Sequence, residues 1–460
     1  MKKQITLALI TSFAVGLMIF QNCGSNSGGY GGATNDVSSP CAAPATWFPH
    51  SQTPKPIENG PSSPFYNINT TTNCDFHLWS WQKFLYLTQT DSNGKPRFEN
   101  LIQVNNQMQL LGTTLNLIDS SQAGTQTILV DKQGRAIYYS IYMDPVMYGF
   151  AKIYTNLFKQ QCYTNGKLDA AKLHAKGYDT LNYPVGSFEL KVAWIMASSV
   201  PTNQLQNFYV TTAKFNGTTV KVAMVGMHIA GRVVNHPELI WATFEHKNAA
   251  PTAQWPANIL TDSTPNPAQV LSTNDYLFYN ANTPLDSCSI VKSKGVVGPF
   301  KSIYHLFDHG TQPEYIGITQ AAKSQDSTNL VNIDSINTSV FAQLSTSDVW
   351  SNYEYFGSIW INPVTAPLTP NDPNIGSLYA ANLRGSRALS NIAAETYIQY
   401  LGKKAPTPTI SFNCFGCHNT VDFNNNNAGY NLALSHLFSN NLSLITKLKT
   451  IDQQHLPLAK

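Results

Sequence analysis

Five residues near the C-terminus constrain this chain more than any other feature. Cys414-Phe415-Gly416-Cys417-His418 has the C-x-x-C-H pattern, which is typical of covalent haem c attachment. Two thiols three positions apart on a tight turn can each reach one vinyl group of the same porphyrin, and the adjacent imidazole then falls under the iron. The motif therefore predicts one haem c, bound covalently by Cys414 and Cys417, with His418 as the proximal iron ligand.

The motif lies too close to the C-terminus to build a haem domain alone. Only 42 residues follow His418, and no methionine, the usual distal ligand of small cytochromes c, occurs beyond Met227. The short remainder also argues against a thiol-disulfide oxidoreductase, whose motif opens the first helix of a domain that continues well downstream. A zinc site would need a second Cys/His pair at matching spacing, which is not seen. We expect the body of the protein to complete the haem pocket.

That body is predicted to be α+β, an antiparallel β-sheet-rich structure with inserted helices. Asn216-Gly217, between two strand-like runs, is among the strongest hairpin signals. The predicted strands are Thr127–Val130, Ala136–Met143, Phe188–Met196, Phe208–Phe215, Thr218–His228 and Leu239–His246. The predicted helices are Leu78–Thr88, one starting at Pro145, one from Leu389 to Tyr400, and Leu432–Lys449. The stretch from about Pro251 to Asn352 is predicted to be rich in loops.

The N-terminus predicts export. Lys2-Lys3 precede an apolar run from about Ile5 to Phe20, which is typical of a signal peptide. Cys23 follows, and the whole resembles a bacterial lipoprotein leader, although Phe20, Gln21 and Asn22 replace the usual small residues. We expect Cys23 to be lipidated and the protein to lie in the periplasm or at the cell surface, as an outer-membrane lipoprotein.

The chain divides into four predicted parts. Residues 1–22 form the signal peptide and residues 23–40, rich in Gly, Ser and Asn, form a flexible tether to the membrane. Residues 41–385 form the β-rich body, and residues 386–460 form the helical haem-attachment segment packed on it. Charged residues make up only 12% of the chain and its net charge is +3. Such a weak field excludes nucleic acid as a partner.

Four further cysteines are predicted to form two disulfides in an oxidising compartment: Cys41, Cys74, Cys162 and Cys288. Three pairings are open. Cys41 with Cys74 closes a short N-terminal loop and leaves Cys162 with Cys288.

Candidates for the distal iron ligand follow the Asn-Gly hairpin. Strand alternation puts His228 on one face with Val220, Val222 and Met224, and Met227 on the other, so only one of Met227 and His228 can reach the iron from a regular strand. His246 is a further candidate. For each histidine the ordinary alternative is a hydrogen-bonded core or edge residue, and for His77 and His436 packing or surface roles are favoured.

Two resemblances accompany these patterns. Met227–His246, Phe76–Gln82 and Glu395–Tyr397 resemble segments of a family of exported bacterial proteins labelled cytochrome c family, which implies one covalent haem c and no particular reaction. More faintly, Val185–Trp194 resembles a strand of the β-sheet cytochrome c′-beta proteins and their hydroxylamine-oxidising relatives. Those proteins leave the distal iron face open, and Lys191 would correspond to a lysine that the hydroxylamine-oxidising ones cross-link to the porphyrin.

Three functions are compatible with this sequence. The first is electron transfer by a tethered, six-coordinate haem that docks transiently on redox partner proteins. The second is a five-coordinate haem that binds or oxidises a small molecule such as nitric oxide, hydroxylamine or peroxide. The third is a surface binding protein that a structural haem stabilises. Electron transfer asks least beyond the motif.

Overall fold

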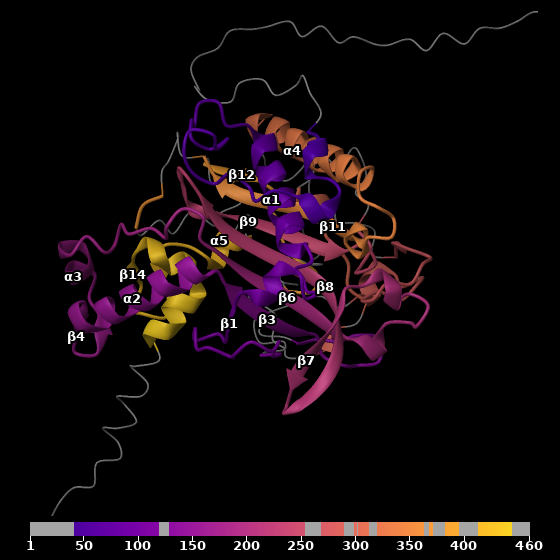
Figure 1. The fold of residues 1–460 in the computed structure, drawn as a ribbon, viewed down its shortest axis with the longest axis horizontal. Helices are drawn as coiled ribbons and strands as arrows, with labels where there is room; N and C mark the ends of the chain where they lie inside the picture. The colour runs from indigo at the N-terminus through magenta and orange to yellow at the C-terminus, as the bar shows by residue number, and fades with distance from the viewer. Residues whose placement is uncertain are drawn as a thin grey trace, which may run out of the picture.

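An eight-stranded antiparallel sheet organises the protein (Figure 1). The computed structural model describes residues 41–118, 128–253, 268–288, 299–300, 302–311, 320–362, 368–370, 382–394 and 413–443. The predicted signal peptide, Cys23 and the predicted tether lie outside these ranges. The sheet, with helices on it, confirms the predicted α+β class.

The strands of the sheet run in the spatial order β1, β3, β6, β8, β9, β11, β12, and β7 pairs with β8. Their bounds are β1 Ile102–Val104, β3 Tyr138–Met143, β6 Phe188–Met196, β7 Val210–Phe215, β8 Thr218–Val233, β9 His236–His246, β11 Tyr353–Ile361 and β12 Leu383–Gly385. Short pairs outside this sheet are β2 (Ile128–Leu129) with β10 (Pro299–Phe300), β4 (Tyr163–Thr164) with β5 (Lys167–Leu168), and β13 (Val421–Asp422) with β14 (Ala428–Gly429).

Two helices, α1 (Asn73–Thr88) and α4 (Gln320–Phe341), cover one face of the sheet (Figure 1). Apolar side chains of α1, α4 and the central strands form one buried cluster. Helix α1 begins five residues before the predicted Leu78 because Thr72 and Asp75 form a capping box, which satisfies its first amide groups.

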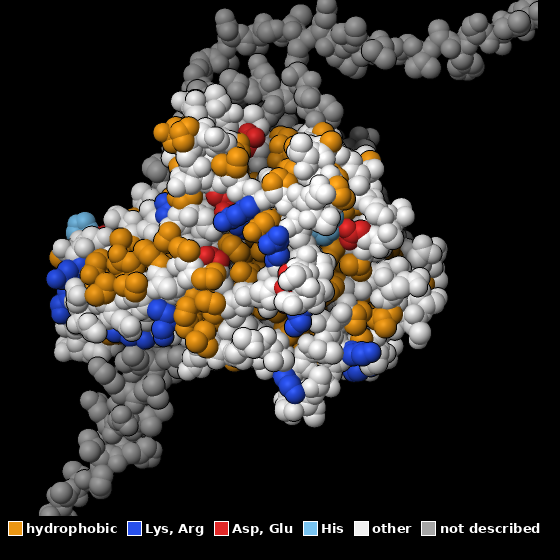
Figure 2. Space-filling view, in the orientation of Figure 1, with side chains coloured by type: hydrophobic (Ala, Val, Ile, Leu, Met, Phe, Trp, Pro, Cys, Tyr) orange, Lys and Arg blue, Asp and Glu red, His pale blue; other side chains and the backbone are white. Residues whose placement is uncertain are grey.

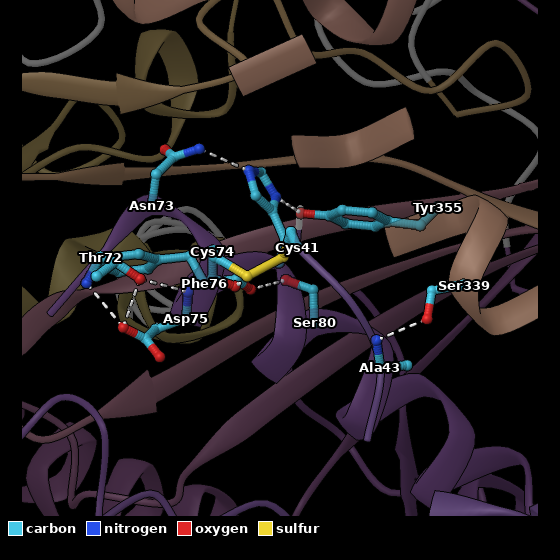
Figure 3. The surroundings of a disulfide bond; sticks show 11 residues. Cys41, Ala43, Thr72, Asn73, Cys74, Asp75, Phe76, Ser80, Ser339 and Tyr355 are labelled. Carbon is cyan, nitrogen blue, oxygen red and sulfur yellow. Dashed lines mark hydrogen bonds between the residues drawn. A yellow bond between two sulfur atoms is a disulfide. The ribbon is translucent and has the colours of Figure 1, made fainter. Parts of the chain in front are cut away.

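The start of α1 is joined to the N-terminal segment by the disulfide Cys41–Cys74 (Figure 3). The predicted pairing of these two cysteines is therefore confirmed. Beside the disulfide, the Ala43 amide donates to Ser339 Oγ of α4 at 2.9 Å. The N-terminal segment thus holds α1 and α4 together.

The second predicted disulfide, between Cys162 and Cys288, is wrong, because both residues are free thiols. Cys162 ends α2 (Pro145–Gln161) among the side chains of Leu168 and Leu173. Cys288 ends a short 3-10 helix, where its thiol donates to the Pro284 carbonyl at 3.6 Å. Burial raises the pKa of both thiols, that of Cys288 to about 12.

The opposite face of the sheet carries α2 and the C-terminal segment, residues 413–443. This segment contains α5 (Cys414–Cys417), the 3-10 helix η9 (Asn431–Leu434) and helical residues 436–443. In Figure 1 it lies beside α2, with α3 (Ala170–Ala175) further out. No helix within the described ranges is both long and apolar enough to span a membrane.

Several predicted elements are confirmed. Strand β6 has the predicted bounds, α2 starts at Pro145 with Asp144 as its cap, and β7 and β8 are joined at Asn216-Gly217. Asn216 and Gly217 have φ values of 49° and 79°, which is the left-handed backbone that tight hairpin turns need. A turn over Asp131–Arg135 joins the first two predicted strands, with the Ile137 amide donating to the Leu129 carbonyl.

Two expectations about helices fail. The stretch predicted to be loop-rich contains α4. The sequence of this helix is rich in Asn and Ser, which disfavour helices, but Ile333, Ile336 and Val340 lie on one buried side of it. The helix predicted from Leu389 is absent over Leu389–Ala394, and its continuation lies outside the described residues. Within Leu389–Ala394 the backbone amides donate to side chains instead of to helical carbonyls. The Glu245 carboxylate accepts from the Ile392 amide, and the Asn391 side chain accepts from the amides of Ala393 and Ala394.

Candidate haem-binding site

The C-x-x-C-H motif forms one helical turn on the second face of the sheet. Cys414 and Cys417 are the first and last residues of α5, so their side chains project from the same side of the turn. Phe415, between them, is fully buried. The Asn413 side chain donates to the Arg387 carbonyl at 3.1 Å. The turn is thus fixed to the body, with both thiols directed to one side.

The imidazole of His418 is oriented by the backbone that follows it. Its Nδ1 lies 2.8 Å from the Leu434 carbonyl, which can only accept, so Nδ1 carries the proton. Burial, together with the nearby His436, Lys191 and His228, holds the pKa of His418 well below its usual range. The ring is therefore neutral at pH 7, and Nε2 keeps a lone pair that can ligate a metal.

Two rings flank the His418 imidazole. The ring centroid of Trp241 lies 4.1 Å from it and that of His436 lies 4.0 Å from it. Two rings cannot share one face at that distance, so they cover its two faces and leave its edges for Leu434 and for a ligand at Nε2. His436 is held in turn because its Nε2 donates to the Cys417 carbonyl at 3.0 Å.

A β-bulge in β8 reverses the alternation of its side chains. Ala193 of β6 pairs with Gly226, but the next residue, Trp194, pairs with Met224, so Val225 is an extra residue on β8. From that point, residues that a regular strand would direct to one face lie on the other.

The bulge corrects the predicted faces of His228 and Met227. Met227 lies with Val222 and Met224 in the core beneath α1. His228 therefore lies on the opposite face from Val222 and Met224, and the expectation that they share a face is wrong.

His228 lies on the face that carries His418. It pairs across the sheet with Thr243 of β9, two residues from Trp241, and its Nδ1 lies 2.9 Å from Thr243 Oγ1. On the other side it pairs with Lys191 of β6. His228 and Lys191 are close enough for their charges to lower the pKa of His418. Strands β6, β8 and β9 thus direct a histidine, a lysine and a tryptophan toward the motif.

The remaining histidine candidates lie elsewhere. His246 is on the α1 side of β9, stacked on Phe208 at 3.6 Å, with its Nε2 donating to the Asn207 carbonyl. His77 is buried in α1, where its ring nitrogens lie within hydrogen-bond distance of Tyr355 and Asn73, and burial lowers its pKa to about 3. Both have the packing roles that are ordinary for buried histidines, and the structure does not bring them to His418.

A buried carboxyl group lies under the same segment. Glu189, two residues before Lys191 on β6, accepts a 2.6 Å hydrogen bond from Ser435 Oγ. Ser435 directly follows Leu434, whose carbonyl orients His418. Burial raises the pKa of Glu189 to about 7. The Glu189 carboxyl therefore gains or loses its proton near neutral pH. It is hydrogen-bonded to Ser435, the residue next to the Leu434 carbonyl that orients the His418 imidazole.

We expect Glu189→Gln to flatten the pH dependence of stability. In the folded protein the pKa of Glu189 is raised, so its contribution to stability is fully present below about pH 4.5 and is lost as pH rises through about 7. The whole change is on the order of 3 kcal/mol. Melting temperatures followed by circular dichroism should fall between pH 5 and 8 in the wild type and less so in Glu189→Gln. The exposed Asp286→Asn should behave as the wild type; equal pH profiles for all three would contradict the assignment.

The residues around His418 fit a covalently attached haem. Cys414, Cys417, His418, His228, Lys191 and His436 are each half-buried, although most apolar neighbours are fully buried. Each of these side chains therefore keeps some accessible surface near the motif. Within the described ranges no group of three His, Cys, Asp or Glu side chains is arranged to hold a bare metal ion. A haem needs fewer protein ligands because the porphyrin supplies most of the donors.

Sequence reasoning missed several parts of this site. Thr243, Trp241, Glu189 and Ser435 had no predicted role, and His436 was assigned to packing or the surface. The signal for Thr243 and Trp241 was present, since both alternate along the strand that follows His228. The Leu434 carbonyl left no signal, because any residue supplies a carbonyl.

Comparisons of this chain with protein-family models, with curated proteins and with solved structures found no match. Any functional assignment therefore depends on the chain's own residues and their geometry.

Proposed function

We propose that this protein is an exported, lipid-anchored monohaem c-type cytochrome that transfers electrons. Cys414 and Cys417 would hold the haem covalently, and His418 and His228 would supply the two iron ligands. The observation that carries the proposal is the neutral His418, which is directed by a backbone carbonyl and follows a single turn bearing two thiols. That combination matches what haem c attachment requires of a protein.

The hydrogen bonds that hold both imidazoles support a six-coordinate site. When bound, the haem supplies a one-electron iron couple. His228 keeps its ring fixed through Thr243, as His418 does through Leu434. Two preorganised imidazoles reduce the rearrangement that accompanies a change of iron charge, which suits electron transfer. The flanking Trp241 and His436 exclude water from the faces of the proximal ring.

Lys191 favours a second candidate function. It lies directly across from His228 and its ammonium group lies 4.3 Å from the ring of Tyr139. A cation next to the distal face suits a small polar or anionic ligand, such as hydroxylamine or peroxide. In that case His228 would assist the ligand, and the iron would be five-coordinate.

Covalent haem attachment should be lost entirely in the Cys414→Ala/Cys417→Ala variant. Neither thioether can form without these thiols, and residual His418 ligation would not survive denaturation. We would produce the protein in a bacterium with haem-attachment machinery and measure haem staining on denaturing gels and the pyridine haemochrome spectrum.

The matched control is Cys162→Ala/Cys288→Ala, which removes two buried thiols elsewhere and should keep one haem per chain. Stain that persists without Cys414 and Cys417, or a wild-type protein without covalent haem, would refute the proposed function.

A further inference from the structure

The α2–α3 lobe, residues 145–178, carries a concentration of positive charge. It contains five lysines and one aspartate, whereas the net charge of the whole chain is only +3. The lysines are Lys152, Lys159, Lys167, Lys172 and Lys176. The acidic residues at the borders of the lobe already have partners within it. Asp144 is buried and caps α2, and the Asp179 carboxylate lies 2.8 Å from His174 Nδ1. The lobe therefore presents a cationic surface on a weakly charged protein.

An uncharged, partly apolar face of α2 lies among these lysines. Val146 and Ile153 are 56% and 59% exposed, and their spacing of seven residues puts them on the same side of the helix. On that side Gly149 lies between Val146 and Ile153, and Asn156 lies beyond Ile153. Figure 2 shows hydrophobic side chains gathered over this lobe, with basic side chains at its edge.

The lobe packs directly on the C-terminal segment that bears the haem motif. The ring of Phe158 lies 5.5 Å from that of Tyr430 and 5.3 Å from that of Phe438. Lys159 Nζ donates to Asn441 Oδ1 at 3.0 Å, and Tyr163 donates to the Leu442 carbonyl at 3.3 Å. In Figure 1, α2 lies alongside this segment. A protein bound to the lobe would therefore be next to the segment that holds the haem.

We propose that the α2–α3 lobe is the docking surface for an acidic electron-transfer protein. This inference rests on the proposed function. Val146 and Ile153 form the apolar centre of the contact, and the lysines form its charged rim. Transient redox interfaces are small and have this anatomy of apolar core and polar rim. Complementary charge accelerates the encounter without making the complex long-lived.

An anionic lipid surface is the competing occupant, and the structure favours the protein. Helices that lie in a membrane interface present a broad apolar face with several large side chains. On the outer side of α2, Gly149, Asn156 and Gln160 interrupt the apolar surface, so only Val146 and Ile153 are strongly exposed. Two such side chains suit a protein contact better than insertion among acyl chains.

The first experiment measures charge at the lobe with small redox probes. Reduced protein is mixed in a stopped-flow instrument with anionic hexacyanoferrate(III) or with cationic tris(phenanthroline)cobalt(III), and the haem absorption is followed. At low ionic strength, Lys152→Glu/Lys176→Glu should slow the anionic reaction about three- to tenfold and accelerate the cationic one, and salt should remove both effects. The control Lys214→Glu/Lys221→Glu, exposed on the β7–β8 hairpin, should change both rates much less.

The second experiment tests protein docking, with reduced plant-type ferredoxin as an acidic one-electron donor. Lys152→Glu/Lys176→Glu and Ile153→Ser should both slow reduction of the haem several-fold, whereas Ile153→Ser should leave the rates with the small complexes unchanged. Equal effects of the lobe and hairpin reversals, or no effect of either, would overturn the proposal. So would binding to phosphatidylglycerol vesicles that depends on Lys152 and Lys176 while the ferredoxin rate does not. Absence of covalent haem would instead refute the proposed function.

Discussion

Reduced protein carrying His228→Ala should bind carbon monoxide within seconds, whereas the wild type should not. In the proposed site, His228 would be the second iron ligand, and its Nδ1 lies 2.9 Å from Thr243 Oγ1, which fixes the ring. Alanine leaves the second ligand position open. We also expect the reduction potential to shift by on the order of 100 mV, since axial ligands tune haem potentials over roughly 0.8 V. Absorption spectra with and without carbon monoxide, and a redox titration, measure both effects.

Met227→Leu is the matched control, because Met227 is adjacent in sequence but lies in the core on the other face of the sheet. A leucine conserves its volume, so the stability cost should stay below about 1.5 kcal/mol and the haem spectrum should be unchanged. If the wild-type protein binds carbon monoxide rapidly, His228 is not an iron ligand. The second candidate function, with Lys191 beside an open distal face, would then be favoured.

Glu58→Leu should destabilise the protein by about 3–5 kcal/mol. The Glu58 carboxylate accepts from Lys83 Nζ at 2.7 Å and from Trp79 Nε1 at 3.0 Å. The Lys83 side chain has no exposed surface, and its burial lowers its pKa. Removing the carboxylate leaves a buried cation and a buried indole N–H without their acceptor. Urea unfolding followed by circular dichroism measures the loss.

A double variant tests whether the lost stability comes from leaving Lys83 as a buried charge without its partner. Glu58→Leu/Lys83→Met removes both charges and should recover most of the stability, since apolar replacement of a buried pair is often neutral. As a surface control, Asp275→Asn breaks a pair with Lys132 whose two side chains are 68% and 29% exposed, and should cost at most about 1 kcal/mol. Equal losses in the free energy of unfolding for Glu58→Leu and Asp275→Asn would show that the buried pair contributes no more to stability than the exposed pair.

The sequence predicted the parts of the fold that local signals specify. Asn216-Gly217 identified its hairpin because few other residues adopt the left-handed backbone of that turn. Pro145 identified the start of α2 for a similar local reason. Helix α4 escaped prediction because its stability comes from packing on α1, which a polar composition conceals.

The candidate site also contains residues that local spacing predicts and residues that only the fold brings together. Spacing alone predicted Cys414, Cys417 and His418 as the haem-attachment residues, since the proposed chemistry depends on nearby positions in the chain. The neighbours of His418 come from distant strands and could not be found by spacing: Trp241 lies on β9 and Glu189 on β6. The face of His228 depended on a single extra residue in β8, which strand alternation does not reveal.

In the proposed haem site, the bulge at Val225 makes the choice of iron ligand depend on a single extra residue in β8. Met227 and His228 are adjacent, and the extra residue before them determines which one leaves the core. Loss of one residue there would exchange an imidazole for a thioether without any change in either side chain. If His228 ligates iron as proposed, a single deletion in β8 would change the electron affinity of the site, whereas substitutions would have to alter both the ligand and the core.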